Sequence, residues 1–152
     1  MGNKTVMKKA NKILFFAYGS NMSHSQMNES CPGSKFIKRA ILKDYKFVYD
    51  GNSDKGAGAS GNIVKSKNSK VYGGLFEISE QNLAELDKGD GYAENYDRIE
   101  VEVKDDENIS YEAFVYFRKW KRKGKPHPLY RKIVIMGARD CGLSEEYIAD
   151  NL

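Results

Sequence analysis

The sequence predicts an α+β protein with a small, mixed or antiparallel, barrel-like β-sheet and flanking helices. Three observations favour this class: many short segments alternate apolar and polar residues, turn residues separate them, and the few helical patterns do not alternate regularly with strands. The 152 residues have the length of one compact domain, and no internal repeat divides them. We therefore expect a single domain over residues 1–152, with residues 1–12 as a flexible basic N-terminus.

In the first part of the chain, the apolar run at residues 13–17 predicts a buried strand that stops in a tight loop. Residues 23–30 predict a short helical turn. Residues 35–49 predict one or two strands with a bend near residues 43–44, and residues 51–61 predict a loop.

The remaining elements follow from periodicity and from residues that cap helices. The predicted strands are residues 63–64, 71–78, 96–103 and 111–117, with a polar turn at 65–70, and helices are predicted after residues 79, 128 and 144. Ser79 and Ser144 are typical helix N-caps, and Gly142 is expected to end the helix before it. The Gly73–Gly74 pair allows another part of the backbone to come close to its strand.

Composition and charge argue against several classes of protein. The 25 basic and 21 acidic residues give a net charge of +4, which does not require a nucleic-acid partner. No apolar run approaches the roughly 20 residues that span a bilayer, and the apolar run near the N-terminus lacks a signal-peptide cleavage pattern. Cys31 and Cys141 form no disulfide framework, and neither histidine has a metal-ligand spacing. We expect a cytoplasmic protein without a metal site.

The loop after the first predicted strand is a candidate binding site. Gly19 can adopt a positive φ and lets a ligand approach the main chain, while Ser20 and Asn21 favour turns. Successive N–H groups in such a loop form a concavity that suits a carboxylate or phosphate. Many strands end in a similar loop only to reverse direction, so the loop alone does not assign a site.

An acid and several tyrosines are further candidates. Asp90 lies between two glycines, where it either turns the chain or presents a carboxylate. Four tyrosines at the ends of predicted elements either pack in the core or direct a hydroxyl into a pocket; these are Tyr18, Tyr96, Tyr116 and Tyr130.

Two other patterns carry less information. Residues 118–125 combine basic side chains with Trp120, which is typical of a solvated loop or of a nucleic-acid patch. A Ser20–His24 or Cys–His nucleophile pair is chemically conceivable, but the spacing in the sequence does not support it.

Three motifs in the same order resemble those of the γ-glutamylcyclotransferase family. Residues 18–22 resemble its YGSN loop, and residues 86–91 resemble its LDxxEG segment, with Tyr96 matching a tyrosine soon after it. Residues 126–143 resemble its PSPxY…GAxExGL ending, with His127 at the position of the serine. The resemblance covers about residues 13–152. It implies a small mixed barrel with flanking helices, a cavity above the YGSN loop, and no metal or cofactor.

The resemblance also implies a reaction. Members of this family release 5-oxoproline from γ-glutamyl amines or dipeptides, because the free α-amine attacks its own γ-carbonyl and expels the attached amine. The YGSN loop would hold the α-carboxylate, and one carboxylate would act first as base and then as acid. The implied site consists of Asp90 as the catalytic residue and of Tyr18, Gly19, Ser20, Asn21, Tyr96, Tyr116 and Tyr130 as substrate-binding residues.

One departure from the family pattern keeps alternatives open. Asp90 stands where the family has Glu, and its side chain is one methylene shorter; Glu94 is a possible substitute acid. The alternatives are a catalytically weak or inactive member that binds a small amino-acid-like ligand, and a basic nucleic-acid-associated protein. We expect a small-molecule γ-glutamyl substrate, no nucleic-acid or membrane partner, and a monomer or homodimer.

Overall fold

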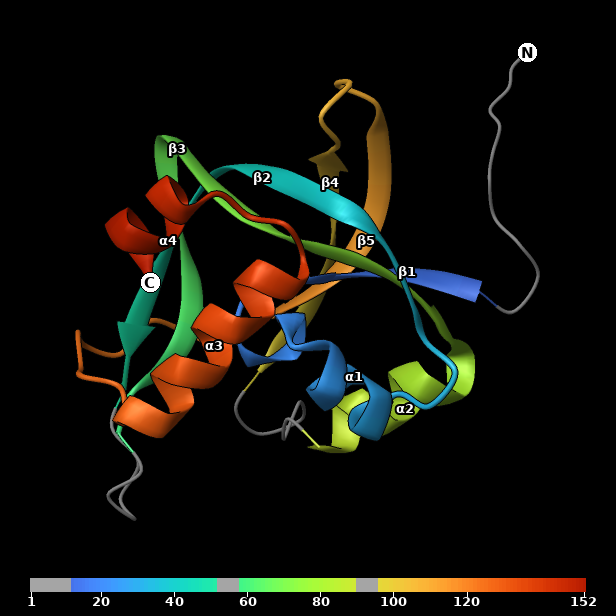
Figure 1. The fold of residues 1–152 in the computed structure, drawn as a ribbon, viewed down its shortest axis with the longest axis horizontal. Helices are drawn as coiled ribbons and strands as arrows, with labels where there is room; N and C mark the ends of the chain where they lie inside the picture. The colour runs from blue at the N-terminus through green and yellow to red at the C-terminus, as the bar shows by residue number, and fades with distance from the viewer. Residues whose placement is uncertain (1–11, 52–57, 90–95) are drawn as a thin grey trace.

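A closed five-stranded β-barrel forms the centre of the fold (Figure 1). The computed structural model describes residues 12–51, 58–89 and 96–152. The strands are β1 (Lys12–Ala17), β2 (Lys35–Asp50), β3 (Ser60–Ser79), β4 (Asp97–Lys104) and β5 (Ser110–Phe117). Around the barrel they follow the order β1-β3-β2-β4-β5. All neighbouring pairs are antiparallel except β1 and β5, which are parallel. The predicted mixed, barrel-like α+β fold is therefore confirmed.

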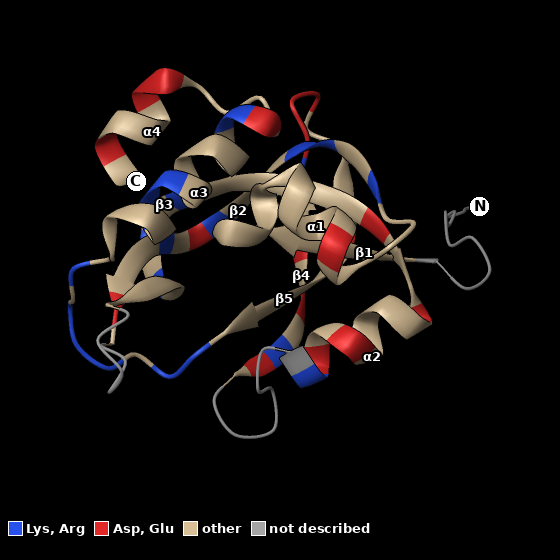
Figure 2. Ribbon diagram, turned by 60° about the horizontal axis from the view of Figure 1, so that its bottom comes forward, with Lys and Arg blue, Asp and Glu red and all other residues tan. Residues whose placement is uncertain are grey.

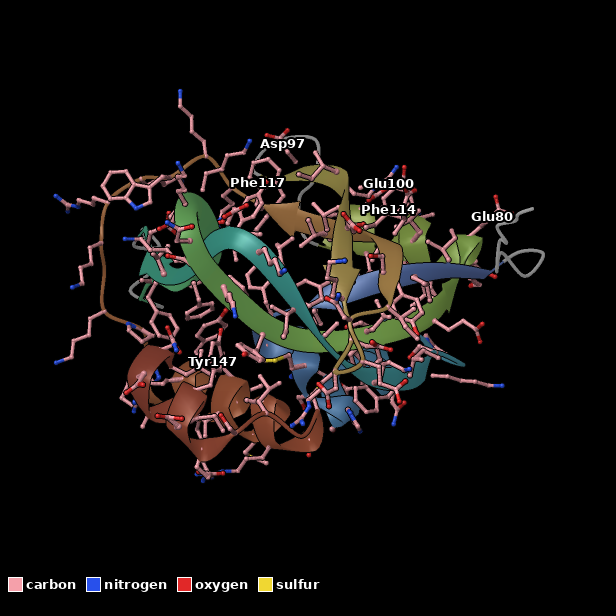
Figure 3. The ribbon with its side chains drawn as sticks, turned by 90° about the horizontal axis from the view of Figure 1, so that it is seen from above. Glu80, Asp97, Glu100, Phe114, Phe117 and Tyr147 are labelled. Carbon is pink, nitrogen blue, oxygen red and sulfur yellow. The ribbon has the colours of Figure 1, made fainter. Side chains whose placement is uncertain are left out.

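Short helices flank the barrel. They are the 3-10 turn η1 (Ser20–Met22), α1 (His24–Ser30), α2 (Glu80–Gly89), α3 (Pro128–Asp140) and α4 (Glu145–Asn151). Figure 1 shows α1 beside α2, and α3 beside η1. Tyr147 of α4 packs on Tyr72 of β3, with ring centroids 4.9 Å apart (Figure 3). In the described part of the chain, no helix is long and apolar enough to cross a membrane.

The helix boundaries follow the capping residues. The Ser79 hydroxyl accepts the Asn82 N–H, and the Asn82 side chain accepts the Ser79 N–H, each at 3.0 Å. The Ser144 hydroxyl accepts the Tyr147 N–H at 3.1 Å, and Gly142 adopts a φ of 78° just after α3. The caps predicted at Ser79 and Ser144 and the stop predicted at Gly142 are confirmed.

The long strands β2 and β3 correct one expectation from the sequence. The predicted turn at residues 65–70 is wrong, because β3 continues through it as a single strand of 20 residues. The register shifts between Lys43 and Tyr45, which confirms the predicted bend in β2. Asp44 and Asn68 both have positive φ, and the Asp44 carboxylate accepts the Asn68 N–H at 3.0 Å. The polar residues thus belong to an irregular, exposed part of the strand pair, not to a chain reversal.

Glycines allow the close contacts that position the loop after β1. A Cβ at Gly73 would overlap the Ala17 carbonyl oxygen, which confirms that the glycine pair in β3 admits a close backbone approach. A Cβ at Gly137 would overlap the Ser23 backbone nitrogen, so α3 rests directly on the end of η1. Both ends of the loop between β1 and α1 are therefore held by tightly packed neighbours.

The β4–β5 hairpin is anchored by the buried carboxylate of Asp105. Its Oδ1 accepts the N–H groups of Glu107 and Ile109 at 2.9 Å each. Its Oδ2 accepts hydrogen bonds from the Lys38 ammonium at 3.0 Å and from the Tyr111 hydroxyl at 3.1 Å. Chiefly because of the Ile109 N–H, the pKa of Asp105 falls to about 2.

We expect this carboxylate to make stability depend on acid pH. The folded pKa of about 2 lies below the unfolded value, so ionised Asp105 stabilises the fold above that unfolded value. The contribution should decline as the pH falls from about 4 through about 2. Asp105→Asn should lower the Tm at pH 7, and the difference from wild type should narrow over that range.

Thermal unfolding of wild type, Asp105→Asn and the neighbouring control Asp106→Asn from pH 7 to pH 2 measures this effect. Asp106 is more than half exposed, so its variant should show the smaller change. If the Tm difference between Asp105→Asn and the wild type stayed constant down to pH 2, the role assigned to Asp105 would be contradicted.

Candidate active site

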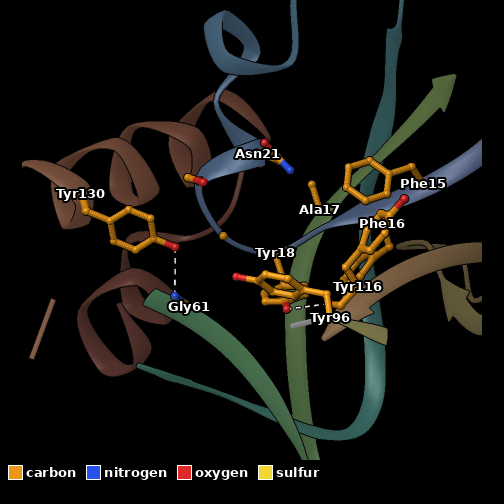
Figure 4. Close-up of a pocket in the computed structure, with 11 residues that line it drawn as sticks. Phe15, Phe16, Ala17, Tyr18, Asn21, Gly61, Tyr96, Tyr116 and Tyr130 are labelled. Carbon is orange, nitrogen blue, oxygen red and sulfur yellow. Dashed lines mark hydrogen bonds between the residues drawn. The ribbon is translucent and has the colours of Figure 1, made fainter. Parts of the chain in front are cut away.

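A cavity of about 80 Å³ lies where β1 ends (Figure 4). One water molecule needs roughly 10–15 Å³ by the same measure, so the cavity has room for a small polar group. Phe15, Phe16, Ala17 and Gly61 form part of its wall. The other lining residues are the seven that the sequence analysis assigned to substrate binding: Tyr18, Gly19, Ser20, Asn21, Tyr96, Tyr116 and Tyr130. The predicted catalytic residue Asp90 and the substitute acid Glu94 lie outside the described residues.

The loop at Gly19 contributes main chain to the cavity. Gly19 does not use its capacity for a positive φ, since it has φ −123° and ψ −133°. A Cβ built there would lie 3.7 Å from the Tyr130 hydroxyl oxygen, which also lines the cavity. The glycine therefore matters because it leaves the main chain uncovered toward the cavity, not because it adopts a left-handed conformation.

Tyr130, from the first turn of α3, faces the loop from the opposite wall. Its hydroxyl oxygen accepts the Gly61 N–H of β3 at 2.9 Å (Figure 4). Burial raises the pKa of Tyr130, so the side chain is a neutral phenol at ordinary pH. Gly61 was not singled out from the sequence, where it ended a predicted loop. A Cβ there would lie 2.9 Å from the Phe47 ring, which explains the glycine.

Tyr18 and Tyr116 form a second wall, connected by hydrogen bonds. The Tyr18 hydroxyl donates to the Tyr116 carbonyl at 2.6 Å, and the Tyr116 hydroxyl donates to Asp87 Oδ1 at 2.5 Å. Asp87 Oδ2 lies 2.5 Å from Arg98 Nη1. Burial and the hydrogen bond to Asp87 raise the pKa of Tyr116, so it too remains a phenol.

Asp87 and Arg98 were not identified as site residues from the sequence. The only signal was that Asp87 belongs to the segment at residues 86–91 that resembles a family motif. Its contact with Tyr116 spans 29 residues, and a pairing at that separation leaves no mark in local periodicity. The structure alone shows that this acid lies behind the wall of the cavity.

Arg118 lies behind another part of the wall. Its guanidinium pairs with Asp50 at 2.7 Å, and its Nη2 donates to the Ser60 hydroxyl at 2.6 Å and to the Gly61 carbonyl at 3.3 Å. It also lies over the Tyr96 ring, 5.4 Å from the centroid. Arg118 is only 7% exposed, so this member of the basic run at residues 118–125 does not face solvent. Figure 2 shows the Lys and Arg residues of the segment after β5.

Among the described residues, the cavity lining contains phenols, a hydroxyl, an amide and main chain, but no carboxylate, imidazole or ammonium. The described residues also contain no group of three or more His, Cys, Asp or Glu that could hold a metal ion. The described lining itself therefore supplies no carboxylate or imidazole for proton transfer.

Of the nucleophile pairs considered from the sequence, Cys141 and His24 do not form a reactive site. His24 packs on the Phe36 ring at 4.8 Å, and its Nε2 lies 4.0 Å from Cys141 Sγ. That thiol is buried and donates to the Met22 carbonyl at 3.4 Å, and burial raises its pKa to about 12. Since the thiolate is the nucleophile, Cys141 is inert at neutral pH.

Barrel and cavity define the class of this protein, a small α+β barrel with a tyrosine-lined cavity at the end of β1. A solved structure of a γ-glutamyl cyclotransferase superimposes with a TM-score of 0.85 and 30% identity, over 91% of this chain and 85% of that chain. The AIG2-like family profile matches residues 70–150. Human γ-glutamylcyclotransferase is 31% identical over 140 residues, covering 89% of this chain and 74% of the human protein. The mouse protein is 30% identical over 141 residues, with the same coverage. The chain therefore belongs to the AIG2-like, γ-glutamylcyclotransferase family.

Proposed function

We propose that this protein is a γ-glutamyl cyclotransferase, which converts a γ-glutamyl amine or dipeptide into 5-oxoproline and a free amine or amino acid. The observation that carries the proposal is the cavity at the end of β1, where three separate parts of the chain bring together the residues that resemble the family motifs. Relatives about 30% identical over most of the chain are named for this activity.

In the proposed reaction, the substrate's α-nitrogen forms a bond to its own γ-carbonyl carbon and closes a five-membered ring. The bond between that carbon and the leaving nitrogen then breaks, and the leaving nitrogen takes up a proton. The main chain at Gly19, Ser20 and Asn21 binds the α-carboxylate, and Tyr130 faces it from α3. With the carboxylate held, the α-amine stays close to the γ-carbonyl, and this proximity supplies much of the rate.

The proton must move from the α-ammonium to the leaving amine, and we assign this transfer to Asp90. The described cavity lining contains no carboxylate or imidazole for this role. Asp90 follows the last residue of α2 directly, and Tyr96, six residues later, lines the cavity. A single carboxylate can accept the first proton as a base and return it to the leaving amine as an acid.

A second cavity gives the leaving group a place to extend. It has a volume of about 390 Å³ and shares Ser20 and Asn21 with the first cavity. Its wall also includes Glu29 and Glu85. The charge of the leaving group is therefore the substrate property to vary first.

Incubation with a panel of γ-glutamyl compounds tests the proposal. The panel should contain cationic, neutral and anionic leaving groups, and 5-oxoproline should be measured by liquid chromatography with mass spectrometry. At least one compound should release 5-oxoproline, and its α-N-acetyl derivative should release none, because acetylation removes the nucleophile. Calorimetric binding of panel compounds without any 5-oxoproline would instead identify a ligand-binding member of the family that lacks the reaction.

A further inference from the structure

Asp87 joins three elements directly behind the cavity wall. It lies in α2 and accepts hydrogen bonds from Arg98 of β4 and Tyr116 of β5. Arg98 and Tyr116 are cross-strand partners in the β4–β5 ladder. One oxygen of the Asp87 carboxylate therefore binds β4 and the other binds β5. The Arg98 guanidinium lies 5.0 Å from the centroid of the Phe114 ring, which fixes its position further.

We propose that Asp87 is a positioning residue for the cyclotransferase reaction, acting through the Tyr116 hydroxyl. The inference rests on the proposed function and adds a role to it: Asp87 sets the direction of the hydroxyl of Tyr116, a residue that lines the cavity. Asp87 itself is not among the residues that line the cavity.

The geometry leaves Tyr116 little freedom. Its ring packs edge-on against Phe15, with centroids 5.9 Å apart, and its carbonyl accepts the Tyr18 hydroxyl. The Tyr116 hydroxyl also interacts with the Arg98 guanidinium, and its hydrogen bond to Asp87 fixes the rotation of the hydroxyl proton. A phenol that donates its one proton to a carboxylate acts only as an acceptor toward any other group.

This constraint makes Tyr116 a selective partner for a substrate. Toward a ligand in the cavity it accepts hydrogen bonds from an ammonium or an amide N–H, and it cannot donate to a carboxylate while it is bound to Asp87. The Gly19–Asn21 loop, with its main-chain N–H groups, suits the carboxylate instead. Asp87 thereby helps to orient a γ-glutamyl group, with an N–H group toward Tyr116 and the α-carboxylate toward the Gly19–Asn21 loop.

A double-mutant cycle separates this role from a general effect on folding. The variants are Asp87→Ala, Tyr116→Phe and their combination, with Asp97→Asn, an exposed acid on β4, as the control (Figure 3). Asp87→Ala and Tyr116→Phe should each lower kcat/KM by about 10-fold or more, because small misplacements in a reaction site are costly. The kcat/KM of the double variant should be no lower than that of the less active single variant. The kcat/KM of Asp97→Asn should equal that of the wild type.

Arg98→Met identifies the other possible role of Asp87, which is to tie α2 to β4 by an ion pair. If that were its contribution, Arg98→Met would lower kcat/KM as much as Asp87→Ala does. The double variant Asp87→Ala/Tyr116→Phe would then lose kcat/KM by the product of the two single losses. That result, or an Asp87→Ala variant as active as the wild type, would overturn the proposal.

A measurement without substrate keeps this inference distinct from the proposed function. Proton NMR of the wild type should show a downfield, slowly exchanging phenolic proton, assigned by its loss in Tyr116→Phe. The signal should also be lost in Asp87→Ala and kept in Asp97→Asn. A wild type that releases no 5-oxoproline refutes the proposed function; an active wild type that lacks this proton refutes the positioning role alone.

Discussion

Asp90→Asn should reduce the release of 5-oxoproline by at least about 100-fold, since acid–base transfer by a positioned side chain contributes roughly 10²–10⁴-fold. The carboxamide is close to the carboxylate in size but cannot accept the α-ammonium proton at neutral pH. The contacts assigned to the substrate's α-carboxylate are on the Gly19–Asn21 loop, so KM should change little. Steady-state kinetics with the best compound of the panel gives both constants.

Asp90→Glu is the matched comparison, because it introduces the residue of the family motif and keeps the charge. The longer side chain moves the carboxylate by roughly 1 Å, a displacement that can change a rate on the order of 100-fold in either direction. We expect substantial activity in this variant and wild-type activity in Glu94→Gln. Full activity in Asp90→Asn, or a large loss in Glu94→Gln, would contradict the assignment of the catalytic acid.

Asp50→Asn should destabilise the protein by about 3–5 kcal/mol, the cost typical of breaking a buried ion pair from one side. Asp50 is 1% exposed and Arg118 7%, so the variant would leave a buried cation without its counter-charge. The Asp50 carboxylate also accepts the Asn62 amide at 3.0 Å and the Lys121 N–H at 3.1 Å. Urea unfolding at pH 7 should show a lower midpoint with a similar m value.

Asp106→Asn provides the control, because Asp106 pairs with Arg39 at 2.9 Å on the surface. An exposed pair contributes no more than about 1 kcal/mol, so this variant should unfold close to the wild type. Arg118 also contacts the Gly61 carbonyl and the Tyr96 ring, both part of the cavity wall. Asp50→Asn should therefore also weaken binding of γ-glutamyl compounds. Equal midpoints for the two variants would show that the buried pair does not stabilise the fold.

Features with short-range causes were predictable from the sequence. The strand at residues 13–17 and the caps at Ser79 and Ser144 depend on neighbours within a few positions. The error at residues 65–70 has a physical reason. A polar, exposed segment of a strand has the composition of a turn, and only the pairing of Lys65 and Lys70 with β2 on either side of it shows that the strand continues.

The candidate site was predictable only as separate pieces. Motif resemblance named the tyrosines and the loop, and the structure places those seven residues around one cavity; their roles in binding remain predictions. Arg118 could not be recognised as buried, because its partner Asp50 is 68 residues away in the sequence and the residues after Arg118 form a basic, exposed run. The same holds for Asp87, whose contacts are with β4 and β5.

By itself, the sequence determined the α+β class, most element boundaries and the candidate loop at Gly19, because capping, turn and alternation signals are local. Only the tertiary structure decided that β1 and β5 close a barrel, that α3 rests on η1 through Gly137, and that Asp87 and Arg118 stand behind the cavity wall. These contacts join residues far apart in the chain, and their partners are chosen by burial and hydrogen-bond geometry, which no short stretch of sequence encodes.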